Sequence, residues 1–71
     1  MNIDEKIGYK LKLARQQSEL TGKEVAEQLY ISPTHLSNIE NGKRKVSLEN
    51  LVKFSELYQK DVVYFLSDFK K

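Results

Sequence analysis

The residues that could do chemistry in this chain are few, and their types favour binding over catalysis. The sequence has no cysteine, a single histidine (His35) and no glycine-rich loop of the kind that holds a phosphate. No nucleophile stands with an identifiable base, so no catalytic constellation can be assembled. A lone histidine without cysteine or clustered acids does not make a metal site. The sequence therefore predicts neither an enzyme nor a cofactor or metal site.

Basic residues form the clearest charge signal, although the formal net charge is only +2. A run of three, Lys43, Arg44 and Lys45, directly follows a predicted helix. The first predicted helix carries four more: Lys6, Lys10, Lys12 and Arg15. Such clustering indicates an anionic partner when a motif supports it, whereas basic residues on helix surfaces are otherwise usually only solvated.

The centre of the chain predicts two short helices joined by a tight turn. Thr21 and Glu24 have the spacing of a capping box, in which hydroxyl and carboxylate each accept a backbone amide. Ser32 followed by Pro33 predicts a second helix start, an N-cap with proline at the first helical position. An asparagine–glycine pair at 41–42 predicts where this second helix ends.

Each of these two helices has one apolar face. Val25, Ala26 and Leu29 form the first face, and Leu36 and Ile39 form the second. Helices this short must pack against neighbours at a steep angle. The second helix also has a polar face that packing does not use. This combination is the helix-turn-helix unit, which places its second helix in the major groove of DNA.

The whole chain predicts one compact all-α domain over residues 1–71, with a core from about 7 to 66. A chain of 71 residues is near the lower limit for a self-sufficient core. Ser47 and Asp61 are the expected caps of the last two helices. The five expected helices cover about 4–18, 22–29, 33–41, 48–58 and 62–66, without any strand.

The composition also carries an expectation about the compartment. Absence of cysteine fits a reducing cytoplasm. No apolar run approaches the roughly 20 residues that span a bilayer, and the polar N-terminus MNIDEKIGYK lacks a signal-peptide core. We therefore expect a cytoplasmic protein without a membrane partner, a small-molecule ligand or a second, ligand-sensing domain.

Over residues 7–66, the chain resembles the Cro/phage-repressor type of helix-turn-helix regulator, also called the XRE family. The run LSNIENGK at 36–43 carries most of this resemblance. The other matching residues are Arg15, Val25, Ala26, Ile31 and Ser32. The resemblance implies a repressor-like five-helix domain that usually binds double-stranded DNA as a dimer. It also implies a bacterial or phage-encoded protein that works at the nucleoid.

The resemblance further implies which residues contact DNA. The outward positions early in the second motif helix reach base edges in this family, and here they are Pro33, Thr34, Ser37 and Asn38. Phosphate contacts come from the start of the first motif helix and the loop after the second: Thr21, Gly22, Lys23, Asn41, Lys43 and Arg44. To these we add Lys45 and His35; the alternative for the histidine is a half-buried ring between the two helices.

Asn38 is the strongest candidate for a base contact. An amide pairs bidentately with adenine N6 and N7, which is worth about 1–3 kcal/mol of discrimination. The alternative is an ordinary solvated side chain. Thr34 offers a hydroxyl or a methyl group, Ser37 reaches a base through water or reaches only phosphate, and Pro33 chiefly sets the phase of the helix. Because these side chains are small, we expect DNA shape to contribute to specificity.

Comparison with the family pattern adds three structural expectations. Glu19 and Tyr30 stand where the family commonly has glycine, and a left-handed backbone costs other residues about 1–2 kcal/mol. Gly22 stands where the family often has glutamine, so only backbone amides and the helix dipole remain there to hold a phosphate. The resemblance also implies an internal salt bridge between Arg15 and Glu40.

The C-terminal third is more apolar than its short helices require. The stripe expected to face the core in the helix at 48–58 consists of Leu48, Leu51, Val52, Ser55 and Tyr58. Phe54 and Leu57 lie off this stripe, and the segment VVYFLSDF, ending in Phe69, adds to the surplus. Because exposed apolar patches mark interfaces, we expect a two-fold dimer centred on Tyr64 and Phe65, with Phe54. The alternative is that a small domain simply exposes some apolar surface.

Together these patterns predict a sequence-specific DNA-binding regulator acting as a dimer on an inverted repeat. Its half-sites would lie one helical turn, about 34 Å, apart. Phage repressor, restriction–modification controller and antitoxin all stay open within this class. A second class also stays open, a protein-interaction module that uses the same fold to bind a partner protein. Charge reversal at Lys43 and Arg44, compared with truncation of Phe65, would separate the two classes.

Overall fold

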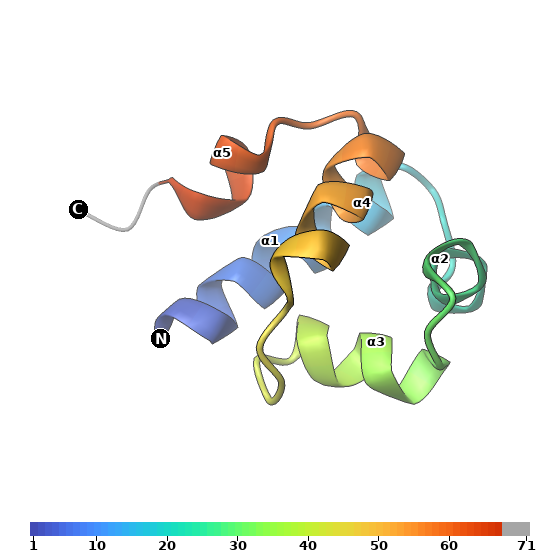
Figure 1. Ribbon diagram of the computed structural model, residues 1–71, viewed down its shortest axis with the longest axis horizontal. Helices are drawn as coiled ribbons and strands as arrows, with labels where there is room; N and C mark the ends of the chain where they lie inside the picture. Colours follow the sequence, from blue (N-terminus) through green and yellow to red (C-terminus); the bar gives the residue numbers. More distant parts are fainter. Residues whose placement is uncertain (68–71) are drawn as a thin grey trace.

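The computed structural model describes residues 1–67 of the chain, and this part consists of five helices without a strand (Figure 1). In chain order they are α1 (Ile3–Gln17), α2 (Gly22–Leu29), α3 (Pro33–Glu40), α4 (Leu48–Tyr58) and α5 (Val62–Leu66). The α2 and α3 helices form the helix-turn-helix pair, and α3 packs against both α1 and α2. Phe69, which the sequence analysis counted among the surplus apolar residues of the C-terminal segment, lies outside the described residues.

Side-chain caps account for where the helices begin. Thr21 and Glu24 form the predicted capping box, and the hydroxyls of Ser32 and Ser47 accept amides at the starts of α3 and α4. A further capping box between Asn2 and Glu5 explains why α1 begins at Ile3, one residue before the predicted start. Asp61 precedes α5 without forming a side-chain cap hydrogen bond. Local hydrogen bonding thus sets the starts of the first four helices.

Within residues 1–67, three residues other than glycine adopt the left-handed backbone at helix ends. Glu19 and Tyr30, the two positions that resemble glycine sites, both have φ of 59°. Gln59 has φ of 56° after α4, which the sequence pattern did not indicate. Such residues each carry a local conformational cost, which the surrounding packing offsets.

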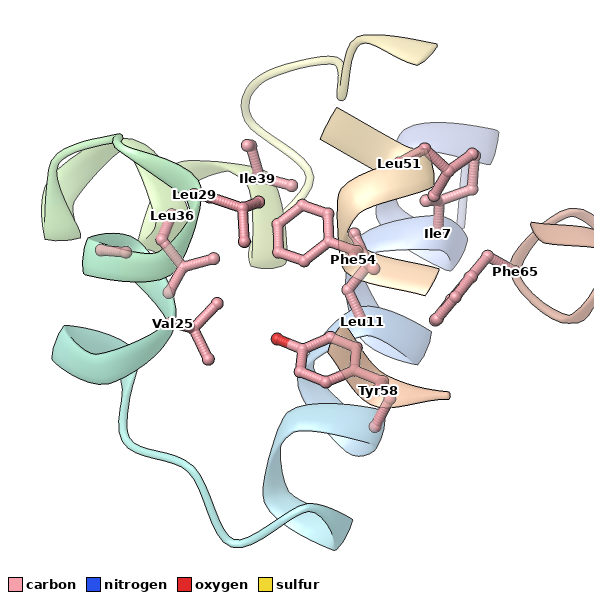
Figure 2. Packing of buried hydrophobic residues seen from close by; sticks show 12 residues of the cluster. Ile7, Leu11, Val25, Leu29, Leu36, Ile39, Leu51, Phe54, Tyr58 and Phe65 are labelled. Atoms are coloured by element: carbon pink, nitrogen blue, oxygen red, sulfur yellow. The ribbon is translucent and has the colours of Figure 1, made fainter. Parts of the chain in front are cut away.

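The predicted orientation of α4 is wrong, because a different face of this helix is buried in the core. Its buried face consists of Leu51, Phe54, Ser55 and Tyr58. Leu48, expected inside, is 73% exposed, whereas Phe54, expected outside, is 0% exposed. Figure 2 shows the Phe54 ring in the middle of the cluster, turned toward Leu29 and Ile39 of the helix-turn-helix pair. A large aromatic ring fills this central space, so α4 turns Phe54 inward and leaves Leu48 in solvent.

Two of the three residues predicted at the centre of a dimer interface, Phe54 and Phe65, are not on the surface. Phe54 and Phe65 are both fully buried within one chain, so neither ring is available to a partner. Tyr64 is half-buried, and the ammonium groups of Lys10 and Lys60 lie 5.1 and 4.7 Å from its ring centroid. The exposed aliphatic side chains on α4 and α5 are instead Leu48, Val52, Val63 and Leu66.

A glycine allows the close crossing of α1 and α3. A Cβ atom at Gly8 would overlap the carbonyl oxygen of Ile39 and lie 2.7 Å from that of Glu40. Only glycine leaves space for this approach, which brings the start of α1 against the end of α3. The α3 helix is therefore held from both sides, by α2 and by α1.

Candidate nucleic-acid interface

The turn between α2 and α3 sets the direction of α3. Tyr30, in the left-handed conformation, reverses the chain, and the Ile31 amide donates to the Ala26 carbonyl at 3.0 Å. Ser32 then accepts the His35 amide at 2.9 Å, and Pro33 opens α3 with a fixed φ. These contacts fix the turn although it lacks the expected glycine.

The polar residues predicted to reach base edges lie on the outer side of α3. Leu36 and Ile39 are buried beneath it. Pro33, Thr34 and Ser37 are exposed, and Asn38 is half-buried. The structure thus brings the four candidate base contacts together on one short helix. His35, on the same helix, is half-buried.

The basic loop after α3 is folded back onto that helix. The carbonyl of Asn38 accepts the amides of Lys43 and Arg44, at 2.9 and 3.3 Å. Gly42 has φ of 76°, and a Cβ atom there would lie 2.5 Å from the Glu5 side chain. The loop is therefore held between α3 and the start of α1, and the three basic side chains at 43–45 extend from it into solvent.

The start of α2 leaves two backbone amides open. The Thr21 amide donates to Glu24 at 2.8 Å, and the Glu24 amide donates to Thr21 at 3.1 Å. The amides of Gly22 and Lys23 have no hydrogen-bond partner within residues 1–67. Such amides at a helix start, together with the helix dipole, form an anion-binding arrangement. Gly22 is thus placed to approach an anion through its backbone alone.

An ion pair beneath the surface supports the end of α3. The Arg15 guanidinium contacts both carboxylate oxygens of Glu40, at 2.8 and 3.2 Å, and donates to the Leu20 carbonyl at 3.1 Å. These side chains are only 16% and 7% exposed. The hydrogen bond to Glu40 raises the pKa of Arg15. One guanidinium therefore joins α1, the α1–α2 turn and α3, which is a structural role.

Two contributors to this surface escaped the sequence analysis. Gly8 allows the α1–α3 crossing, and a glycine inside a helical pattern was the available signal for it. Asn41 donates from its amide nitrogen to the Ser37 hydroxyl at 3.3 Å, an i, i+4 contact on the surface of α3. Both Ser37 and Asn41 were candidates for DNA contact, but their hydrogen bond to each other was not predicted.

Within the described part of the chain, no helix is both long and apolar enough to cross a membrane. A family model described as helix-turn-helix matches residues 11–65. Because this match includes all of α2, α3 and α4, it covers the candidate interface and most of the core.

Among the known proteins that resemble the chain are three regulators. It is 42% identical over 60 residues to the HTH-type transcriptional regulator ImmR of Bacillus subtilis, covering 84% of this chain but only 47% of that protein. It is 44% identical over 55 residues to the control protein C.MunI of a Mycoplasma species, covering 76% of this chain and 74% of that protein. The clp gene regulator ClgR from Corynebacterium glutamicum superimposes with a TM-score of 0.88 at 30% identity, covering 93% and 70% of the two chains.

The family match and these relatives agree with the geometry of the α2–α3 pair and with the run LSNIENGK. They point to regulators of transcription rather than to enzymes. The chain therefore belongs to the helix-turn-helix family of the Cro/phage-repressor (XRE) type.

Proposed function

We propose that this chain is a sequence-specific DNA-binding regulator that inserts α3 into the major groove. The observation that carries this proposal is the surface of α3. Its exposed face is polar, and the helix is flanked by open amides at the start of α2 and by basic side chains on a fixed loop. Side chains of this kind contact base edges, while amides and ammonium groups contact phosphates.

Within this proposal, Asn38 makes the main direct base contact, supported by Thr34 and Ser37, and Pro33 sets the position of the helix start. The proposed phosphate contacts form two groups. The first group, at the start of α2, consists of Thr21, Gly22 and Lys23. The second group, on α3 and its loop, consists of His35, Asn41, Lys43, Arg44 and Lys45. Because Thr21 already holds the capping box, Gly22 and Lys23 contribute most of the amide contacts of the first group.

We also propose that the protein acts as a homodimer through a face different from the predicted one. An apolar hollow lies between the start of α1, the start of α4 and the end of α5. The residues that line it include Ile3, Val46, Leu48, Leu51 and Leu66. Leu48 and Leu66 are exposed there, and Val63 on α5 is 67% exposed. A second copy would bury these aliphatic side chains, and Lys45, which also lines the hollow, connects this face to the basic loop.

Selection from a random duplex pool at about 0.15 M salt tests the proposal. We expect an enriched inverted repeat whose half-site centres lie about 10 base pairs apart, the spacing that brings two α3 helices to the same side of DNA. A variant with charge reversal at Lys43 and Arg44 should retain no duplex. The matched control is Lys53→Ala, which removes a basic residue on α4 that pairs with Glu49 at 3.7 Å, and it should retain the same sequences. Retention without sequence enrichment would contradict the proposal.

The exposed apolar hollow also favours a second candidate, a module that binds a partner protein. In that case Leu48→Ser and Leu66→Ser would abolish function, whereas charge reversal on the loop would leave it intact. The two relatives support a regulator of the repressor or controller kind, since one is named a transcriptional regulator and the other a control protein. An antitoxin role would require the protein-binding result.

A further inference from the structure

One hydrogen bond on the outer face of α3 joins two candidate DNA contacts. The Asn41 amide nitrogen donates to the Ser37 hydroxyl oxygen at 3.3 Å, and both residues are exposed. Asn41 directly follows α3 and lies one turn after Ser37. This contact does not involve the core, so it bears on what Ser37 presents to solvent more than on whether the domain folds.

The other serine inside a helix shows what makes Ser37 different. The Ser55 hydroxyl on α4 donates its proton to the Val52 carbonyl at 2.7 Å, a common arrangement for a helical serine. A hydroxyl has a single proton and two acceptor positions. Ser37 accepts a hydrogen bond from Asn41, and its own proton has no acceptor within residues 1–67. The proton of Ser37 is therefore available to an incoming ligand.

We infer that Asn41 is a positioning residue that fixes the polarity of Ser37, so that Ser37 donates to an acceptor atom on a base edge. This inference rests on the proposed insertion of α3 into the major groove. Guanine offers N7 and O6 there, adenine offers N7 and thymine offers O4, whereas cytosine presents only the N4 donor. Ser37 consequently discriminates against cytosine at the base that it contacts.

The isosteric change Asn41→Asp reverses this arrangement. A carboxylate has no proton to donate, so it accepts the Ser37 proton and leaves the serine oxygen as an acceptor. The serine then favours a base-edge donor, the amino group of cytosine N4 or adenine N6. In Asn41→Ala the hydroxyl is free to rotate and presents either polarity, so discrimination at this position should fall toward none.

The test begins with the half-site selected by the unaltered protein. Affinities are measured for duplexes carrying each of the four base pairs at every position of that half-site. The position that loses its preference in Ser37→Ala is the one that Ser37 contacts. At this position we expect the unaltered protein to bind cytosine about tenfold more weakly than the best base, the effect of one base-edge hydrogen bond. In Asn41→Asp, cytosine should gain about tenfold relative to guanine.

The affinities are compared as ratios between base pairs, because an added negative charge near phosphate lowers the affinity for every duplex by the same factor. The double variant Ser37→Ala/Asn41→Asp is the matched control, and it should show no shift toward cytosine because the serine oxygen is absent. Circular dichroism of each variant verifies the helix content.

The possible outcomes separate the two levels of the proposal. If the unaltered protein selects no sequence, the proposed function fails and this inference fails with it. If a sequence is selected but Asn41→Asp keeps the original ratios, or Ser37→Ala changes no position, only the role of Asn41 is overturned. A shift toward cytosine that persists in the double variant would also overturn it.

Discussion

The α2–α3 pair exposes hydroxyls, amides and basic side chains, whereas the α4–α5 pair also exposes several aliphatic side chains. Both pairs bury apolar residues in the same cluster, which Figure 2 shows between them. Two surfaces of opposite chemistry on one small core can serve two partners at once. In our proposal DNA covers the polar surface and a second copy covers the aliphatic one, so changes to the core, to α3 and to α5 should have separable effects.

The largest effect is expected from loss of the ion pair that supports the end of α3. Glu40→Ala leaves the partly buried Arg15 without its carboxylate, a change that costs about 3–5 kcal/mol of unfolding free energy at a dry site. Urea unfolding measures this loss. The matched control is Glu49→Ala, whose exposed pair with Lys53 spans 3.7 Å and should cost about 0–1 kcal/mol. Equal costs for the two variants would contradict a supporting role for the buried pair.

The next effect concerns the helix crossing that positions α3. Gly8→Ala places a methyl group against the backbone of α3, and overpacking of this kind costs about 1–3 kcal/mol. Gly22→Ala is the control, because its Cβ would meet Leu36 at an ordinary 3.7 Å. The control should be neutral or stabilising, since alanine favours the helix. Thermal unfolding of both variants tests the difference, and an unaffected Gly8→Ala would show that α1 and α3 can separate at little cost.

A smaller effect is expected for the aliphatic surface. Leu66→Ser should weaken the dimer about tenfold, because a partly exposed leucine loses the burial that a second copy provides. Analytical ultracentrifugation at several concentrations measures this. Tyr30→Asn, at an exposed position far from the hollow, is the control. A dimer that is equally strong in both variants would place the interface elsewhere.

The smallest effect concerns a buried hydroxyl between the two regions. The Tyr58 hydroxyl has no hydrogen-bond partner within the described residues, and Figure 2 shows its oxygen inside the cluster. Tyr58→Phe removes this unpaired polar group, so unfolding free energy should stay equal or rise by about 1 kcal/mol. Chemical denaturation at pH 7 measures the change. A clear loss of stability would show that the hydroxyl has a partner, for instance a bound water.

The same residue predicts a pH dependence. Burial, followed by the negative charge of Glu40, raises the pKa of Tyr58 above its ordinary value of 10.0. The folded state holds this proton more tightly than the unfolded state, so stability falls as pH rises above about 10. When the pH is raised from 7 to values above about 10, the free energy of unfolding of Tyr58→Phe should therefore fall less than that of the unaltered protein.

The features that sequence analysis predicted well are local ones. Capping side chains such as Thr21 and Ser47 act within one turn, so the bounds of α2 and α4 could be predicted from neighbouring residues. The α2–α3 pair and the polar face of α3 follow from the same short-range rules. The left-handed backbone at Tyr30 was also expected, because the position resembles a glycine site.

The features that it missed depend on residues distant in the sequence. Leu48 was predicted on the core stripe of α4 and Phe54 off it, and only the space left by α1, α2 and α3 selects the phenylalanine for the core. Phe54, predicted at a dimer interface, is therefore buried in the core of a single chain. Gly8 likewise gains its role from the backbone of α3 more than thirty positions away. Side-chain pairs on the surface, such as Ser37 with Asn41, need the helix geometry in addition to the spacing.

The most direct test of DNA recognition by α3 compares Asn38→Ala with Lys43→Ala on the selected operator and on random duplex, across a range of salt concentrations. Lys43→Ala should weaken binding to both duplexes alike and reduce the slope of log affinity against log salt by about 0.9. Asn38→Ala should lower operator affinity by about tenfold or more while leaving random duplex nearly unchanged. Equal losses on operator and random duplex in Asn38→Ala would contradict the insertion of α3 into the major groove.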